Sequence, residues 1–269
     1  MSLSKYLMES DEEALRLDLK TNVNEVTRQA IWAGLKPGMR VADLGCGAGK
    51  TTFCLNQLAN PMAQTMGMDI SKRRIEYARK NYFAPEIEYV QGDICLPLDH
   101  LGIFDFVWIR FVLEYFLSNS FEIVKNVSRI VKPGGILCLV DLDSNCLRYH
   151  GFSLRFEKAI QGIMEDLTLN YNFDPYAGVK LYSYLYDLGY EEINADVTAH
   201  NLICGSVSDH SLFNWQNKVQ ITGKRSGFTF PGYPGGYEEF FQEFKDSISN
   251  PRVFHYSPLV ICKGKKPNL

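Results

Sequence analysis

Short apolar runs alternate along the first half of the chain with segments that can form helices. Residues 41–44 are apolar with one acid, as expected of a parallel strand buried on both faces. Comparable runs occupy 65–70, 87–90, 104–110 and 136–142. After the second run, Ser71 can cap a helix in which Ile75 and Ala78 lie at helical spacing. This alternation predicts an α/β domain built around a parallel sheet.

Glycines follow the first predicted strand directly. Gly45, Gly47 and Gly49 form a G-x-G-x-G pattern that contains Cys46, and Asp43 lies two residues before the first glycine. Glycine is needed where a Cβ would block a tight turn or the approach of a ligand. The helix that can follow would present free N–H groups at its N-terminus. This strand, turn and helix predict a site for a nucleotide-like ligand.

Two other glycine patterns fit less well. The dinucleotide fingerprint G-x-G-x-x-G would place Lys50 where a third glycine packs the helix against the strand. The P-loop pattern ends correctly on Lys50 and Thr51, but its first glycine falls on Leu44. Only the G-x-G-x-G turn preceded by an acid fits without exception.

Further features follow at the ends of the later strands. Asp69 lies at the tip of the second run, and Gly92 and Asp93 follow the third. The fourth run ends in Arg110 and Phe111, and a proline with two glycines at 133–135 leads into the fifth. With these features in order, the chain resembles the class I S-adenosylmethionine-dependent methyltransferases, and the resemblance covers about half of it.

The resemblance implies a fold. It is a three-layer Rossmann-like methyltransferase fold, with a seven-stranded sheet in the order 3-2-1-4-5-7-6, an antiparallel last strand and helical cap elements. It also implies S-adenosyl-L-methionine as cofactor and S-adenosyl-L-homocysteine as product. Asp43 would hold the turn or the cofactor's amino group, Asp69 the ribose hydroxyls and Asp93 the adenine amine. Ile70 and Ile94 would lie on the two sides of the adenine ring.

Residues 7–33 alternate apolar and charged positions at helical spacing, and the stretch 6–17 resembles the lid that covers the cofactor in many members of this family. Arg16 would pair with the cofactor carboxylate and Tyr6 would lie over the sulfonium, while a plain surface helix is the alternative. The carbonyl of Arg110 is expected to face the cofactor's ammonium group. The complete expected cofactor set is Asp43, Gly45, Cys46, Gly47, Gly49, Thr51, Asp69, Ile70, Gly92, Asp93, Ile94, Arg110, Phe111, Arg16 and Tyr6.

One domain, residues 1–269, is predicted. Its core comprises about 29–145, 176–204 and 252–264, and its lid and cap elements comprise about 1–28, 146–175 and 205–251. Apolar spacing predicts helices at 152–169, 176–188 and 237–248, and strands at 190–203 and 253–263. Residues 205–251 are otherwise the least readable part of the chain.

The composition of the chain narrows the kinds of partner that the protein is expected to bind. The 269-residue chain has a formal net charge of −3, which argues against nucleic acid because such a partner needs a basic face. Seven scattered cysteines without a C-x-x-C pair favour reduced thiols in a cytoplasmic protein and argue against a zinc site or another metal. The chain shows neither a signal peptide nor a membrane-spanning run, so no membrane partner is predicted. The expected partner is a small-molecule acceptor, and the oligomeric state stays open.

Catalytic residues are harder to predict than cofactor residues. Methyl transfer needs alignment of the two reactants, and it needs a base only if the acceptor must lose a proton. His150, Glu114, Tyr115 and His200 are the candidates, and for His150 a surface position is the favoured alternative. Three rival functions stay open: a cofactor-binding protein without turnover, a protein or RNA methyltransferase, and an NAD-dependent oxidoreductase. Lys50 and the pair Gly92-Asp93 count against the last.

Overall fold

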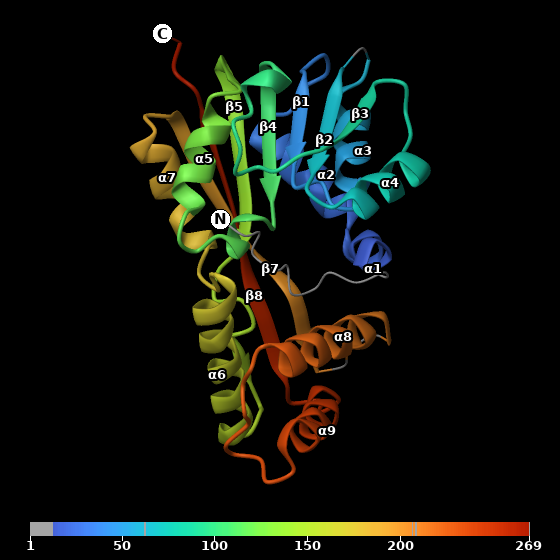
Figure 1. The fold of residues 1–269 in the computed structure, drawn as a ribbon, viewed down its shortest axis with the longest axis vertical. Helices are drawn as coiled ribbons and strands as arrows, with labels where there is room; N and C mark the ends of the chain where they lie inside the picture. Colours follow the sequence, from blue (N-terminus) through green and yellow to red (C-terminus); the bar gives the residue numbers. More distant parts are fainter. Residues whose placement is uncertain (1–12, 62, 206, 208, 269) are drawn as a thin grey trace.

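The computed structural model describes residues 13–61, 63–205, 207 and 209–268, which form one sheet with helices on both faces and a group of helices beyond one end (Figure 1). The strands are β1 Val41–Leu44, β2 Thr65–Asp69, β3 Ile87–Gln91, β4 Phe104–Arg110, β5 Val131–Leu142, β6 Tyr149–His150, β7 Glu191–Cys204 and β8 Phe254–Lys265. The α-helices are α1 Glu13–Lys20, α2 Val23–Ala33, α3 Lys50–Ala59, α4 Lys72–Asn81, α5 Ser120–Ser128, α6 Leu154–Tyr171, α7 Leu181–Asp187, α8 Asp209–Arg225 and α9 Gly236–Ile248. Short 3₁₀ helices are η1 Asp99–Leu101, η2 Leu113–Tyr115 and η3 Gly178–Lys180.

Side chains on the two faces of the sheet enter two separate hydrophobic clusters. From β4, Val107 and Ile109 enter one cluster, whereas Phe106 and Trp108 enter the other. Helices α5 and α7 contribute to the first cluster, and α2 and α3 contribute to the second. Because helices cover both faces, the central strands read as continuous apolar runs, which is why the hydrophobic pattern predicts them.

The strand order confirms the predicted fold class. β1 pairs in parallel with β2 and β4, β3 pairs with β2, and β5 pairs with β4. β8 lies antiparallel between β5 and β7. Without the two-residue β6, the order is therefore 3-2-1-4-5-7-6 with an antiparallel last strand. The sequence pattern does not predict β6, in which Tyr149 pairs with His255 near the start of β8.

Local capping explains several helix starts. The Ser71 side chain accepts a hydrogen bond from Arg74 N, so the predicted cap of α4 is confirmed. The Ser153 side chain likewise accepts from Phe156 N at 3.2 Å, so α6 starts two residues later than predicted. The helix predicted at 176–188 is divided, because a 3₁₀ turn precedes α7.

A third hydrophobic cluster lies outside the sheet. Segments 146–175 and 205–251, both expected to be cap elements, pack here against the end of β7 and the start of β8. Figure 1 shows α6, α8 and α9 together around this part of the two strands. Helix α8 is not predicted by the sequence reasoning, although Leu212, Trp215 and Val219 lie at helical spacing and all contribute to the cluster. We call α6, α8, α9 and the loops between them the cap.

Candidate active site

The glycine turn follows β1 and leads into α3, as predicted. Gly45 and Gly49 have φ angles of +80° and +87°, in the left-handed region that favours glycine. A Cβ on Gly45 would lie 2.3 Å from Val112 Cγ2, and one on Gly49 would lie 2.6 Å from Ala78 Cβ. The N–H of Gly45 donates to the Met68 carbonyl at 2.7 Å, which holds the turn against β2. The turn therefore excludes side chains at both glycines.

Asp43 is the buried acid before the turn. Its carboxylate accepts a hydrogen bond from Thr52 Oγ1 at 2.7 Å, whereas no such bond involves the predicted residue Thr51. Burial raises the pKa of Asp43 to about 7. Burial also raises the pKa of the Cys46 thiol well above its ordinary value, which disfavours the thiolate form that a nucleophile needs. Asp43 and Thr52 together link β1 to the first turn of α3.

Replacing Asp43 by asparagine should change how stability depends on pH. The folded state holds a proton on Asp43 up to about pH 7, and the unfolded chain releases it near pH 4. The free energy of unfolding of the unsubstituted protein therefore falls as pH rises between these values. We expect Asp43→Asn to remove about 3 kcal/mol of this decline between pH 5 and pH 8. Urea denaturation of both proteins without cofactor, repeated at several pH values, measures this difference. If the free energy of unfolding had the same pH dependence in both proteins, the pKa of Asp43 would not be raised by burial.

Asp69 ends β2 next to the turn and is buried. One carboxylate oxygen accepts from Gly47 N at 2.9 Å and the other accepts from Ser71 N at 2.9 Å. Arg74 Nε lies 3.3 Å from the carboxylate. A carboxylate has about four acceptor positions, so this one keeps capacity for hydroxyl donors of a ligand. The fixed backbone bonds orient it toward the glycine turn.

The tip of β3 lies next to the tip of β2. The N–H of Gly92 donates to the Asp69 carbonyl at 3.0 Å, which brings Asp93 to the same edge of the sheet. Ile70 is 39% exposed at this edge, whereas Ile94 is 7% exposed and packs in the core. Of the two isoleucines expected beside an adenine ring, Ile70 is thus the accessible one.

Helix α1 lies across the glycine turn. A Cβ on Gly47 would be 3.3 Å from Leu17 Cδ1. Lys50 Nζ donates to the Asp18 carbonyl at 2.9 Å, and Tyr77 Oη donates to the Asp18 carboxylate at 3.0 Å. These contacts tie α1 to α3 and α4 in the position expected of a lid.

Arg16 projects from α1 and is not a solvated surface arginine. Its side chain is 14% exposed, and its Nε donates to Glu13 at 2.7 Å. It lines the cavity described below. Tyr6, the other residue predicted in the lid, lies outside the described residues. A role for Arg16 toward the cofactor stays a prediction.

The end of β4 carries a buried positive charge. Phe111 has a φ of +57°, which is uncommon for a bulky residue. The Arg110 guanidinium lies 4.1 Å from the centre of the Phe111 ring, and its buried Nε has no hydrogen-bond partner among the described residues. Burial lowers the pKa of Arg110 to about 10, so the group stays charged at neutral pH.

A hydrogen-bonded chain connects the end of β4 to the cap. Glu114 in η2 is buried, and its carboxylate accepts from Asn145 Nδ2 at 2.8 Å. Asn145 Oδ1 accepts in turn from Lys218 Nζ on α8 at 3.2 Å. The N–H of Glu114 donates to Asp141 at 3.1 Å, and burial together with the Glu114 charge raises the pKa of Asp141 well above its usual range. Lys218 thus reaches the end of the sheet from the cap.

A cavity of about 650 Å³ lies between α1, β7 and α8, and we call it the cationic cavity. Its charged lining residues are Arg16, Lys20 and Lys218. Lys20 Nζ lies 4.9 Å from the centre of the Phe111 ring, so the cavity is next to the end of β4. Burial, followed by the charges of Lys218 and Arg16, lowers the pKa of Lys20 to about 7.

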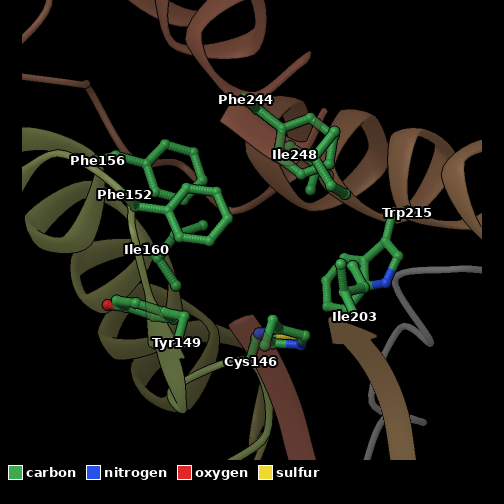
Figure 2. A pocket seen from close by; sticks show the side chains of 11 residues that line it. Cys146, Tyr149, Phe152, Phe156, Ile160, Ile203, Trp215, Phe244 and Ile248 are labelled. Carbon is green, nitrogen blue, oxygen red and sulfur yellow. The ribbon is translucent and has the colours of Figure 1, made fainter. Parts of the chain in front are cut away.

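A second cavity of about 350 Å³ lies inside the cap, and we call it the cap cavity (Figure 2). Phe156 and Ile160 of α6 and Phe244 of α9 surround it. Ile203 and Trp215 line both cavities, so the two are adjacent.

The catalytic candidates separate into two groups. His200 lies with its ring 5.2 Å from Phe111, close to the cationic cavity, and burial holds its pKa well below the usual range. Glu114 lies at the same end of β4. Tyr115 instead packs on Phe173, and His150 is exposed on β6. Only Glu114 and His200 therefore stay as candidates near the glycine turn.

Sequence reasoning missed the two lysines of the cationic cavity. Arg16 and Lys20 lie four residues apart, so one face of a single helix could have indicated that they act together. Nothing local links them to Lys218, which the tertiary fold brings from α8. Thr52 was not predicted as the partner of Asp43, because the glycine pattern gives no reason to prefer it to the neighbouring Thr51.

A metal site needs a cluster of ligand side chains, and a membrane span needs a long apolar helix. Within the part of the chain that the structure describes, no cluster of three or more histidine, cysteine, aspartate or glutamate side chains is arranged to hold a metal ion. Among the same residues, no helix is both long enough and apolar enough to cross a membrane.

Comparison with known families identifies the central segment. The family described as "Methyltransferase domain" matches residues 42–139, from β1 through the glycine turn to β5. Residues 42–139 belong to the methyltransferase domain family. The resemblance to class I S-adenosylmethionine-dependent methyltransferases is confirmed for this segment.

Relatives of the methyltransferase domain share this core. A demethylmenaquinone methyltransferase of Lactococcus lactis subsp. lactis is 33% identical over 107 residues, which cover 38% of this chain and 42% of that protein. The chain thus spans less than half the length of this curated relative. A solved structure of a putative methyltransferase from Bacillus halodurans has a TM-score of 0.57 at 18% identity and covers 91% of this chain and 99% of that one.

A ligand-bound structure has the same fold. Phosphoethanolamine N-methyltransferase 2 of Haemonchus contortus, in complex with S-adenosyl-L-methionine, has a TM-score of 0.57 at 15% identity. The alignment covers 96% of this chain and 57% of that one. At such identities the two structural likenesses show that the fold is shared.

Proposed function

We propose that this protein is an S-adenosyl-L-methionine-dependent methyltransferase that acts on a small organic molecule. The observation that carries the proposal is the set of groups at the ends of β1, β2 and β3. The glycine turn, which excludes side chains at Gly45 and Gly49, lies beside Asp69 and Asp93. A fold alone does not decide a reaction, so the proposal rests on this site.

The residues fit an adenosyl ligand. A Cβ on Gly45 or Gly49 would clash with Val112 or Ala78, so the close packing of the turn requires glycine at both positions. The Asp69 carboxylate is oriented by two backbone N–H groups and can accept from ribose hydroxyls. Asp93 would bind the adenine amine, and Ile70 would cover the ring.

When bound, the cofactor supplies a methyl group activated by positive sulfur, and its transfer to an acceptor lone pair leaves S-adenosyl-L-homocysteine. The protein aligns the acceptor and excludes water. An acceptor that carries an O–H or N–H must also release a proton. His200 is neutral at pH 7, because burial lowers its pKa, and its buried Nε2 has no hydrogen-bond partner among the described residues. It can therefore accept a hydrogen bond from that O–H or N–H, although burial and the charges of Lys20, Arg110 and Lys218 make it a weak base.

Several observations favour a small acceptor. The formal net charge of −3 gives no general attraction for nucleic acid. The two cavities are concave and are lined by residues of α1, β7 and the cap, and concave sites of this kind suit a small molecule. The relatives are named for demethylmenaquinone and phosphoethanolamine, and both are small molecules.

Arg16→Ala should weaken the binding of S-adenosyl-L-homocysteine about tenfold, because the carboxylate would lose a charge-assisted partner. Calorimetric titration measures this affinity. The matched control is Arg28→Ala on α2, where the arginine is 44% exposed and pairs with Glu25 and Asp196. Equal affinities of all three proteins would remove Arg16 from the cofactor site.

Thermal unfolding with S-adenosyl-L-methionine, S-adenosyl-L-homocysteine, NAD and ATP in parallel tests the proposed function. A ligand at 100 times its Kd stabilises the folded state by about 2.7 kcal/mol. We expect the melting temperature to rise with the two adenosyl-sulfur ligands alone. A rise with NAD or ATP alone would overturn the proposal.

A further inference from the structure

The cationic cavity holds more positive charge than one cofactor carboxylate explains. Arg16 already pairs with Glu13 and is the residue that we assign to the cofactor. Lys20 and Lys218 also line this cavity, and neither forms an ion pair with an acidic side chain among residues 13–61, 63–205, 207 and 209–268. Both lysines are half-buried, and the charge of Glu114 offsets the charges around Lys20 only in part. Two neighbouring cations without a direct ion pair favour an anionic group on a ligand.

The positions of both lysines are fixed by the structure. Lys218 is held by its hydrogen bond to Asn145, and its Nζ lies 5.4 Å from the centre of the Trp215 ring. Lys20 lies over the ring of Phe111 at the end of β4. An anion between them would therefore lie next to the end of the sheet where the glycine turn begins.

The cap cavity is of the opposite character. Its lining is almost wholly apolar, with Phe156, Ile160 and Phe244 from two helices (Figure 2). Its one imidazole, His255, is 4% exposed, and its Nε2 has no hydrogen-bond partner in the part of the chain described. An unpaired buried nitrogen is a ready partner for a single polar atom of a ligand.

The two cavities are adjacent because Ile203 and Trp215 line both. We propose that the methyl acceptor is an amphipathic organic acid, whose carboxylate binds between Lys20 and Lys218 while its apolar body occupies the cap cavity. This inference rests on the proposed function. It adds the chemical class of the acceptor and assigns Lys20 and Lys218 as residues that determine specificity.

Binding of simple acids to the protein saturated with S-adenosyl-L-homocysteine tests the inference. The probes are octanoate and 2-naphthoate, each compared with its uncharged partner, octan-1-ol or 2-naphthol, and with acetate. We expect at least one acid to bind tenfold or more tightly than its uncharged partner and than acetate. The inference is overturned if neither acid is preferred, or if acetate binds equally well.

Three variants separate the two halves of the site. Lys218→Met should weaken the preferred acid at least tenfold and leave its uncharged partner unchanged. Ile160→Trp, which fills the cap cavity, should weaken both. The matched control is Lys224→Met on the same helix, where the lysine is 50% exposed and close to Glu238, and it should change neither.

Each outcome of the binding and variant experiments supports or overturns a specific part of the inference. Urea denaturation first checks that the variants fold, and Lys20→Met replaces Lys218→Met if the latter does not. If Lys218→Met weakens S-adenosyl-L-homocysteine rather than the acid, the lysine serves the cofactor and the inference is overturned. If the unsubstituted protein does not bind S-adenosyl-L-homocysteine at all, the proposed function fails. If it binds that ligand but prefers no acid, only the acceptor class fails.

Discussion

Asp69→Ala is expected to lower the affinity for S-adenosyl-L-homocysteine about 100-fold. The carboxylate is positioned by Gly47 N and Ser71 N, each at 2.9 Å, and would accept from two ribose hydroxyls. A hydrogen bond to a charged group contributes about 1.5–3 kcal/mol, so the loss of two corresponds to about 3–6 kcal/mol, and a loss of about 100-fold is the lower end of that range. Each 1.4 kcal/mol is a tenfold change in Kd.

The controls for Asp69 separate binding from folding. Asp69→Asn keeps one oxygen acceptor and should lose less affinity than the alanine variant. Asp99→Ala removes an acid that is 52% exposed and pairs with Arg129 away from the turn, so it should bind normally. Calorimetric titration gives the affinities, and urea denaturation checks the fold. Unchanged affinity of Asp69→Ala would show that the ribose does not bind at the tip of β2.

Gly45→Ala is expected to lower the free energy of unfolding by about 2–5 kcal/mol. The backbone at Gly45 has a φ of +80°, and a left-handed alanine costs about 1–2 kcal/mol. The added Cβ would also lie 2.3 Å from Val112 Cγ2, and overpacking of this kind costs about 1–3 kcal/mol. Urea denaturation without cofactor measures the sum.

Two further variants divide that loss into its parts. Gly38 has a φ of +85°, and a Cβ added there would meet nothing within 4 Å, so Gly38→Ala reports the backbone strain alone. Val112→Ala removes the atom that would clash, so the double variant with Gly45→Ala should lose less than the two single losses combined. Equal losses at Gly38 and Gly45 would mean that the predicted clash with Val112 does not occur.

A helix or strand could be predicted from the sequence where residues close together in the chain cause it to form. The central strands were predicted because both of their faces are buried, which forces apolar runs that are visible in the sequence. The start of α4 was predicted because Ser71 caps it through a neighbour three residues away. Helix α8 was missed because its apolar residues pack in the cluster of the cap rather than in the two clusters on the faces of the central strands, and turn-rich sequence follows it.

The residues of the candidate site also divide into those that local sequence determines and those that only long-range packing brings together. The amino-acid sequence by itself determined the glycine turn and the acids at the ends of β2 and β3, since backbone sterics and short-range burial dictate them. The order of the strands followed from the family resemblance that these features carry. Only the tertiary structure decided which cations meet. Lys20 and Lys218 come from helices at opposite ends of the chain, and Asn145 connects Lys218 to Glu114 through hydrogen bonds of 3.2 Å and 2.8 Å. Packing of the cap against β7 and β8 brings them together, and no local pattern encodes that long-range contact.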